Sequence, residues 1–213
     1  MDNNLIASWQ AEYSRTSSTV IIPDGCRDLI VKTLGNGKPN WFVSELFDSS
    51  ELVQIEANSQ WVGFRLSPGA QIKEQALLEY IEAKQCHAQD VESFIGEFVS
   101  SESSIEEALE CFACDTGSIK QSAAQLGVSV RTLQRLVLHK TNRTPSYWLQ
   151  LARLRKAARS LTHSTLLADV AHNHGFSDQS HMNREFQRWL GLTPVQLLSS
   201  PAIIKQLNSK GYA

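Results

Sequence analysis

Two stretches in the last hundred residues decide the fold: residues 119–140 read IKQSAAQLGVSVRTLQRLVLHK, and residues 167–189 read LADVAHNHGFSDQSHMNREFQRW. Each contains a short helical pattern, a glycine, a serine that can cap a helix, and a second helical pattern. The glycines are Gly127 and Gly175, and the serines are Ser129 and Ser177. This order predicts two helix-turn-helix units, a motif whose second helix enters the DNA major groove.

Helical spacing separates the packed side chains of each unit from the outward ones. We expect the packed set of the first unit to be Ala123, Ala124, Leu126, Val128, Leu133, Leu136 and Val137. The packed set of the second unit is Val170, Ala171, Phe176, Met182, Phe186 and Trp189. The side chains left to face DNA are Arg131, Gln134 and Arg135 in the first unit, and Gln179, Ser180, Asn183 and Arg184 in the second. Arginine favours guanine edges and glutamine favours adenine edges, so direct readout of base sequence is predicted.

Residues 146–161, SYWLQLARLRKAARSL, are expected to form one continuous helix between the units. Its apolar face includes Trp148, Leu149 and Ala152, and its four cations are placed elsewhere: Arg153, Arg155, Lys156 and Arg159. Sixteen residues span about 24 Å at about 1.5 Å per residue. With the flanking turns, such a rod can hold two recognition helices about one DNA turn, about 34 Å, apart.

The charge is divided along the chain. Residues 1–100 carry 7 Lys and Arg against 14 Asp and Glu, a net charge of −7. Residues 117–213 carry 13 against 3, a net charge of +10. A basic rear and an acidic front indicate a polyanion-binding region joined to a region that does not touch nucleic acid.

The front half is expected to be rich in β-strands. Short β-branched and apolar runs between residues 18 and 65 predict a small barrel or a curled antiparallel sheet. Helices are expected over 75–84 and 90–99, and the polar run SSESS at 100–104 is the expected hinge. The predicted class is α+β: a small β-rich, barrel-like regulatory or dimerisation domain with trailing helices over 1–100, then an all-α double helix-turn-helix domain over 101–213.

Residues 105–201 resemble the DNA-binding domain of the AraC/XylS family of bacterial transcription regulators. The resemblance is carried by GVSVRTLQR (127–135), ARLRKAARSL (152–161), GFSDQSH (175–181) and the closing GLTP. It implies transcription control by a seven-helix domain, preceded by a domain for effector binding or dimerisation. Val137 stands where an aromatic is usual, and 142–144 stand where a glycine is common, which bears on how tightly the first unit docks.

Residues 23–29, PDGCRDL, resemble a PDGCxDL motif in the front domain of some of these regulators, and Arg65 fits a later element of that domain. From the residues alone, Pro-Asp-Gly predicts a turn in which Asp24 accepts backbone amides, and Cys26 is a small buried residue. The alternative is that Arg27, Asp28 or Arg65 contacts an effector. Both interpretations stay open.

Other classes of function find little support. Cys111 and Cys114 form a lone CxxC on a helical stretch, for which core packing is expected. A cysteine-based methyl acceptor for DNA alkylation repair would need an activated, typically zinc-held thiolate, but the front half holds only Cys26 and Cys86. A non-specific architectural DNA binder would need only phosphate contacts, not such varied recognition faces. No metal, cofactor or enzymatic activity is expected.

The N-terminus carries no signal pattern, and no run of 18 apolar residues occurs. A cytoplasmic location away from membranes is therefore expected. The expected partner is double-stranded DNA. A small-molecule effector, a second copy of the chain and, for an activator, RNA polymerase are further partners that the residues leave open.

Overall fold

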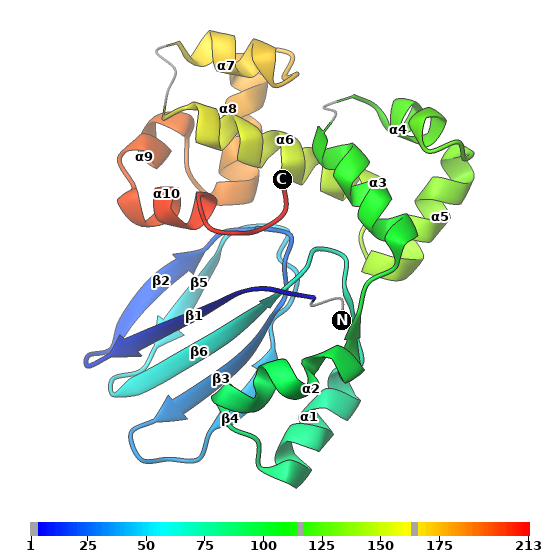
Figure 1. Cartoon of the computed structure of the whole chain (residues 1–213). Helices are drawn as coiled ribbons and strands as arrows, with labels where there is room; N and C mark the ends of the chain where they lie inside the picture. The colour runs from blue at the N-terminus through cyan, green and yellow to red at the C-terminus, as the bar shows by residue number, and fades with distance from the viewer. Residues whose placement is uncertain (1–3, 115–116, 163–165) are drawn as a thin grey trace.

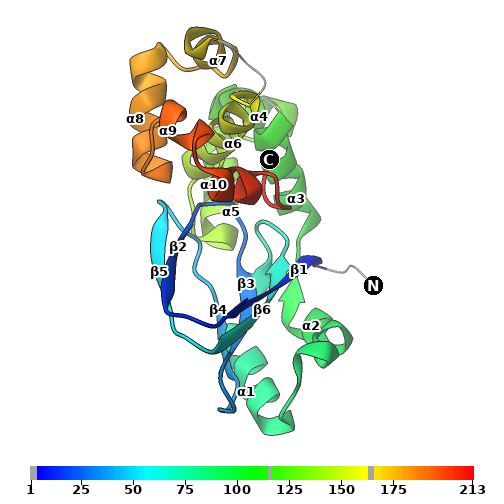
Figure 2. The same ribbon diagram turned by 90° about the vertical axis from the view of Figure 1, so that its left-hand side faces the viewer.

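A computed structural model describes residues 4–114, 117–162 and 166–213, and places a β-rich front part against a helical rear part (Figure 1). The view from the side shows the sheet and its two helices on one side and the remaining helices on the other (Figure 2). The expected α+β class, with strands first and helices after them, is confirmed.

The front part contains an antiparallel four-stranded sheet in the order β1-β6-β3-β4 and a separate two-stranded sheet, β2-β5. The strands are β1 (Leu5–Tyr13), β2 (Ser17–Ile21), β3 (Asp28–Leu34), β4 (Asn40–Val43), β5 (Glu51–Ile55) and β6 (Ser59–Leu66). Among the described residues these sheets do not close, because β1 pairs only with β6 and β4 only with β3. The expected β-rich front part is therefore confirmed, but its antiparallel strands form no closed barrel among the described residues.

Strand β1 was not expected from the sequence. It pairs with β6 from Leu5↔Leu66 to Tyr13↔Ser59. A Cβ on Gly63 would lie 2.1 Å from the indole of Trp9, so this strand pair requires glycine at residue 63. Leu5, Ala7, Trp9, Ala11 and Tyr13 alternate with mostly polar residues, a period-two signal that could have revealed the strand.

Helices α1 (Glu74–Lys84) and α2 (Val91–Phe98) pack against the four-stranded sheet and match their expected ranges within one residue at each end. A short 3₁₀ turn, Ala88–Asp90, precedes α2. The expected hinge is partly ordered, because β8 (Val99–Ser100) pairs with β7 (Gln71–Ile72). The chain therefore leaves the front part through a strand.

The rear part is helical throughout its described residues. Its helices are α3 (Ser103–Cys114), α4 (Ile119–Gln125), α5 (Val130–Thr141), α6 (Pro145–Ser160), α7 (Leu167–Asn173), α8 (Gln179–Leu190), α9 (Pro194–Leu198) and α10 (Pro201–Leu207). None of the helices in the described ranges is long and apolar enough to cross a bilayer.

Each part has its own hydrophobic core, which agrees with two domains, although the boundary at residue 100 stays a prediction. Ile22 is an exception, because it comes from the front part but is buried in the rear core. Helix α3 buries Ile105 and Phe112 there as expected, whereas Cys114 is exposed, so the expected core packing of the cysteine pair is wrong for that residue.

Candidate nucleic-acid interface

Helices α4 and α5 form the first helix-turn-helix unit, as predicted. Gly127 has φ +67°, a conformation that glycine adopts without strain, and it ends α4. Ser129 caps α5, since its side chain accepts a hydrogen bond from the amide of Thr132 at 3.1 Å. Ala124 and Val128, however, are exposed rather than packed, because α4 turns only Ser122 and Ala123 fully inward.

The outward positions of α5 lie where the sequence placed them. Arg131, Gln134 and Arg135 are exposed, while Leu133 and Val137 are buried. Two arginines and one glutamine therefore stand on the first two turns of a capped helix, a pattern that suits reading base edges.

Helices α7 and α8 form the second unit. Its predicted packed residues are buried, Met182 and Phe186 completely. The cap is Asp178 rather than Ser177, because the Asp178 carboxylate accepts the amide of His181 at 2.6 Å. A carboxylate also suits the positive end of the helix dipole, and Ser177 contacts the His181 ring instead.

Of the predicted DNA-facing residues on α8, Gln179, Ser180 and Arg184 are exposed. Asn183 is half-buried, and its buried Oδ1 has no hydrogen-bond partner among the described residues. Asn183 lies next to the buried residues Met182 and Phe186 on α8, so residues at the edge of the core cover part of its side chain. Its expected outward orientation needs this correction.

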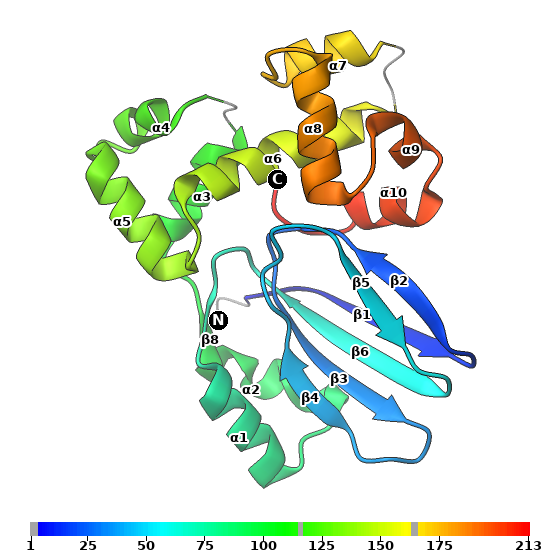
Figure 3. The same cartoon turned by 180° about the vertical axis from the view of Figure 1, so that it is seen from behind.

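Helix α6 joins the two units, one residue earlier than the expected range at each end (Figure 3). Arg155 was expected outside the apolar face, but it is completely buried. It donates to the carbonyls of Pro23 (3.2 Å), Leu207 (3.3 Å) and Tyr212 (2.8 Å), and burial lowers its pKa to about 10. Its spacing of four from the buried Leu151 could have revealed this position.

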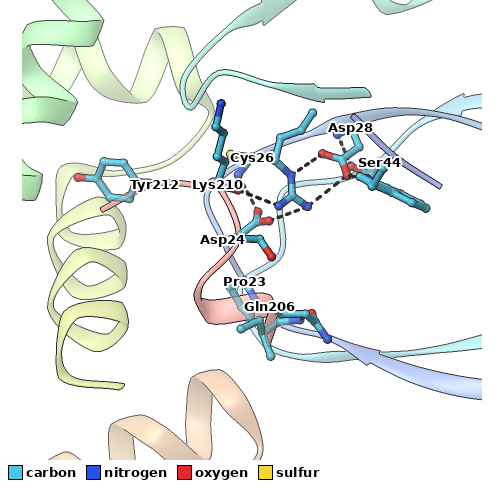
Figure 4. A network of polar contacts seen from close by, with 12 residues as sticks. Pro23, Asp24, Cys26, Asp28, Ser44, Gln206, Lys210 and Tyr212 are labelled. Atoms are coloured by element: carbon cyan, nitrogen blue, oxygen red, sulfur yellow. Dashed lines mark hydrogen bonds and ion pairs between the residues drawn. The ribbon is translucent and has the colours of Figure 1, made fainter. Parts of the chain in front are cut away.

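The Pro23–Arg27 turn is part of a polar network at the junction of the two parts (Figure 4). Asp24 accepts the amide of Cys26 at 2.9 Å and pairs with Arg65 at 2.9 Å. Arg65 also donates to Asp28 at 3.0 Å and to the carbonyl of Lys210 at 2.9 Å. The turn itself contacts the C-terminal residues of the chain, because the amide of Tyr212 donates to the Asp24 carbonyl at 2.8 Å.

Charge and burial oppose each other in this network. Burial raises the pKa of Asp24 above its ordinary value, although Arg65 acts in the opposite direction. Burial disfavours the charge of Arg65, but the hydrogen bond to Asp28 and the charge of Asp24 raise its pKa overall. We infer that Arg65 stays charged and holds the two carboxylates together.

The three predicted effector residues have different environments. Asp28 and Arg65 are bonded to each other, and the indole of Trp9 donates to Asp28 at 2.7 Å. Arg27 lines a cavity of about 540 Å³ between the front part and the α5–α6 corner. It already donates to the Ser44 carbonyl at 2.7 Å and pairs with Glu74 at 2.6 Å.

Cys26 is buried as expected, and burial followed by the charge of Asp24 raises the pKa of its thiol well above the ordinary value. No group of three or more His, Cys, Asp or Glu side chains suited to a metal ion occurs within the described ranges.

The sequence comparisons with known proteins match the rear part. A family model described as a helix-turn-helix domain matches residues 122–200. The HTH-type transcriptional activator RhaS of Escherichia coli O1:K1 / APEC is 40% identical over 73 residues. That match covers 34% of this chain and 26% of RhaS, so the chain spans about a quarter of this relative's length.

Two solved structures also align. A transcriptional regulator with an AraC-type DNA-binding domain from Chromobacterium violaceum is 25% identical, covers 51% of this chain and 95% of its own, and has a TM-score of 0.42. ToxT from Vibrio cholerae is 12% identical, with coverage of 91% and 97% and a TM-score of 0.45. The family match, together with the RhaS similarity, shows that residues 122–200 carry a helix-turn-helix domain of the AraC type.

Proposed function

We propose that this chain is a sequence-specific transcription regulator of the AraC type, which reads two adjacent major-groove segments through α5 and α8. The observation that carries the proposal is the matched pair of capped recognition helices, joined by the single helix α6. Each presents exposed polar side chains on its first turns: Arg131, Gln134 and Arg135, and Gln179, Ser180 and Arg184. The net charge of +10 over 117–213 supplies the attraction to phosphate.

The test is selection of genomic fragments by the purified full chain at near-physiological salt with excess competitor DNA. A shared site covering two successive major-groove segments supports the proposal. Uniform binding to all fragments would favour the architectural alternative, and a folded chain that enriches nothing would contradict the proposal.

Single substitutions then separate base contacts from phosphate contacts. Arg135→Ala and Arg184→Ala are each expected to weaken binding to the selected site by about 1–3 kcal/mol and to relax base preference at one position. The measurement is binding to the selected site and to single-base variants at several salt concentrations. A weaker salt dependence with unchanged sequence preference would reassign the residue to phosphate contact.

For the front part we propose regulation by a small-molecule effector, and the cavity of about 540 Å³ favours this role. Three cations line the cavity, and each is already paired with a carboxylate: Arg27 with Glu74, Lys140 with Glu102, and Arg143 with Asp48. A ligand here would exchange these pairs for its own polar groups. A thermal-shift screen of polar metabolites tests this, and a hit must weaken in Arg27→Ala. Dimerisation and contact with RNA polymerase remain predictions.

The methyl-acceptor alternative is disfavoured by the state of the front-half cysteines. Such chemistry needs an activated thiolate with a lowered pKa. Burial instead raises the pKa of both Cys26 and Cys86. Incubation with methylated DNA, followed by mass spectrometry of the protein, tests the alternative, because a gain of one methyl group on either cysteine would support it.

A further inference from the structure

Residues 46–50, the last five of the loop that joins β4 to β5, contact both the corner after the first helix-turn-helix unit and the last turn of the second, and are called the strap below. Figure 3 shows this end of the β-rich part directly beneath the lower ends of α8 and α10. The strap is only five residues long, so its two contact points are closely linked.

The first contact is with the corner between α5 and α6. Arg143, which follows the C-cap Asn142 of α5, donates to the Leu46 carbonyl at 2.5 Å and pairs with Asp48 at 3.0 Å. The hydroxyl of Tyr147, which is buried in the first turn of α6, donates to the Phe47 carbonyl at 2.9 Å. The end of the first recognition helix is thereby tied to the front part.

The second contact is with the last turn of α8. The backbone amide of Ser50 donates to the Trp189 carbonyl at 2.9 Å, and its hydroxyl donates to the same oxygen at 3.1 Å. Carbonyls in the last turn of a helix have no partner within that helix. Ser50 therefore supplies bonds that α8 lacks, and it does so at the end of the second recognition helix.

The two contact points adjoin each other inside the rear core. The rings of Tyr147 and Trp189 lie 5.3 Å apart, centroid to centroid. One short segment of the front part thus contacts both the α5–α6 corner and the end of α8, where these two regions meet. A shift of the strap would change the angle between α5 and α8 more readily than the internal packing of either unit.

We propose that the strap positions α5 relative to α8 and thereby sets the spacing between the two DNA half-sites that the chain accepts. The inference rests on the proposed function, since it concerns how the two units act on one site. Two helices that read successive major grooves must match a repeat of about 10.5 base pairs. A looser strap leaves each unit able to bind but widens the range of accepted spacings.

The experiment uses the full chain and a DNA series in which the selected half-sites are moved apart or together by one and two base pairs. One variant, Asp48→Ala/Ser50→Ala, cuts the side-chain contacts from the front part, far from the proposed DNA contacts. A second variant, Arg143→Gln/Tyr147→Phe, removes the side-chain contacts that the helical part makes with the strap and keeps the packing of the ring at residue 147. The matched control is Glu56→Ala, which breaks the Lys32–Glu56 pair within the front part.

The wild-type chain and Glu56→Ala are expected to lose roughly tenfold in affinity for each base pair away from the best spacing. Both strap variants are expected to lose about threefold or less per step, with affinity at the best spacing lowered by about fivefold at most. Thermal unfolding checks each variant, and either strap variant alone suffices if the other does not fold.

Two failures are distinguishable. If the wild-type chain selects no specific site, the proposed function fails and takes the inference with it. If the wild-type chain selects a site but the strap variants discriminate spacing as sharply as Glu56→Ala, only the inference is overturned. An equal loss of affinity at every spacing would also overturn it, because that loss would show a stabilising role without positioning.

Discussion

The two helix-turn-helix units share a plan but are anchored differently. Helix α8 buries four side chains, Met182, Phe186, Trp189 and Leu190. Helix α5, of the same length, buries only Leu133 and Val137. It ends on Asn142 in the left-handed conformation, φ +52°, where α8 ends on Gly191.

The difference shows that the second unit is held mainly by its own core, and the first unit depends more on polar contacts with its surroundings. Lys140 at the end of α5 pairs with Glu102, and Arg143 pairs with Asp48 of the front part. Arg143, which lies within the departure at 142–144, is therefore also a residue that contacts the front part.

The largest expected effect concerns the buried side chains of α8 and α5 in the rear core. Trp189→Ala should lower the free energy of unfolding by about 3–5 kcal/mol, because a fully buried indole leaves a large cavity. Val137→Ala should cost about 1–2 kcal/mol, since only two methyl groups are lost. Urea unfolding followed by circular dichroism measures both, and equal losses would contradict the difference in anchoring.

Substitution of Arg155 tests how much the contact with the front part stabilises α6, the helix between the two units. Arg155→Gln should lower the free energy of unfolding by about 2–3 kcal/mol, because a charged donor is lost and buried carbonyls are left unpaired. The matched variant is Arg159→Gln. Arg159 donates to Leu207 at 2.9 Å and to Ala213 but not to the front part, and its loss should cost about 1 kcal/mol. Urea unfolding measures both, and a reversed order would mean that the contact with Pro23 contributes little.

Exchanging the C-cap residues of α5 and α8 tests whether backbone strain differs between the ends of these two helices. Asn142→Gly should stabilise the chain by about 0.5 kcal/mol, and Gly191→Asn should destabilise it by about as much, because only glycine is free of strain at positive φ. No neighbour lies within 4 Å of a Cβ built on Gly191, so the asparagine meets no steric clash there. Thermal unfolding measures both, and shifts of the same sign would show that backbone strain does not govern these ends.

The smallest expected effect is a pH dependence of the free energy of unfolding that arises in the second unit alone. The residue that ends the first helix of each unit is Leu126 in one and His174 in the other. Burial, and then the charge of Lys156, lower the pKa of His174 below its ordinary 6.5, so in the window below that value the unfolded chain binds a proton that the folded chain does not. Stability should therefore fall as the pH drops below about 6.5 and be complete above it.

The pH prediction is measured by urea unfolding between about pH 5.5 and pH 7.5. His174→Gln should flatten the pH dependence, and the control His172→Gln changes an exposed histidine two residues away. Equal slopes for wild type and His174→Gln would reject the assignment.

Local pattern predicted both turns and most of the helix faces of the rear part correctly. The positions of Gly127, Ser129 and Gly175 predicted both turns, and helical spacing predicted the burial of Leu133, Met182 and Phe186. It also predicted the exposure of Arg135 and Arg184. These features follow from contacts a few residues apart, so a periodic sequence encodes them directly.

Long-range contacts decided the rest. Arg155 binds the carbonyl of Pro23, and Ser50 binds that of Trp189, across separations of 132 and 139 residues. A main-chain carbonyl leaves no trace in the residue type that bears it, so such partners are invisible in the sequence. By itself, the sequence determined the two helix-turn-helix units and most of the exposed side chains of α5 and α8. Only the tertiary structure placed the front part against the ends of both helices, because that placement depends on backbone groups that every residue shares.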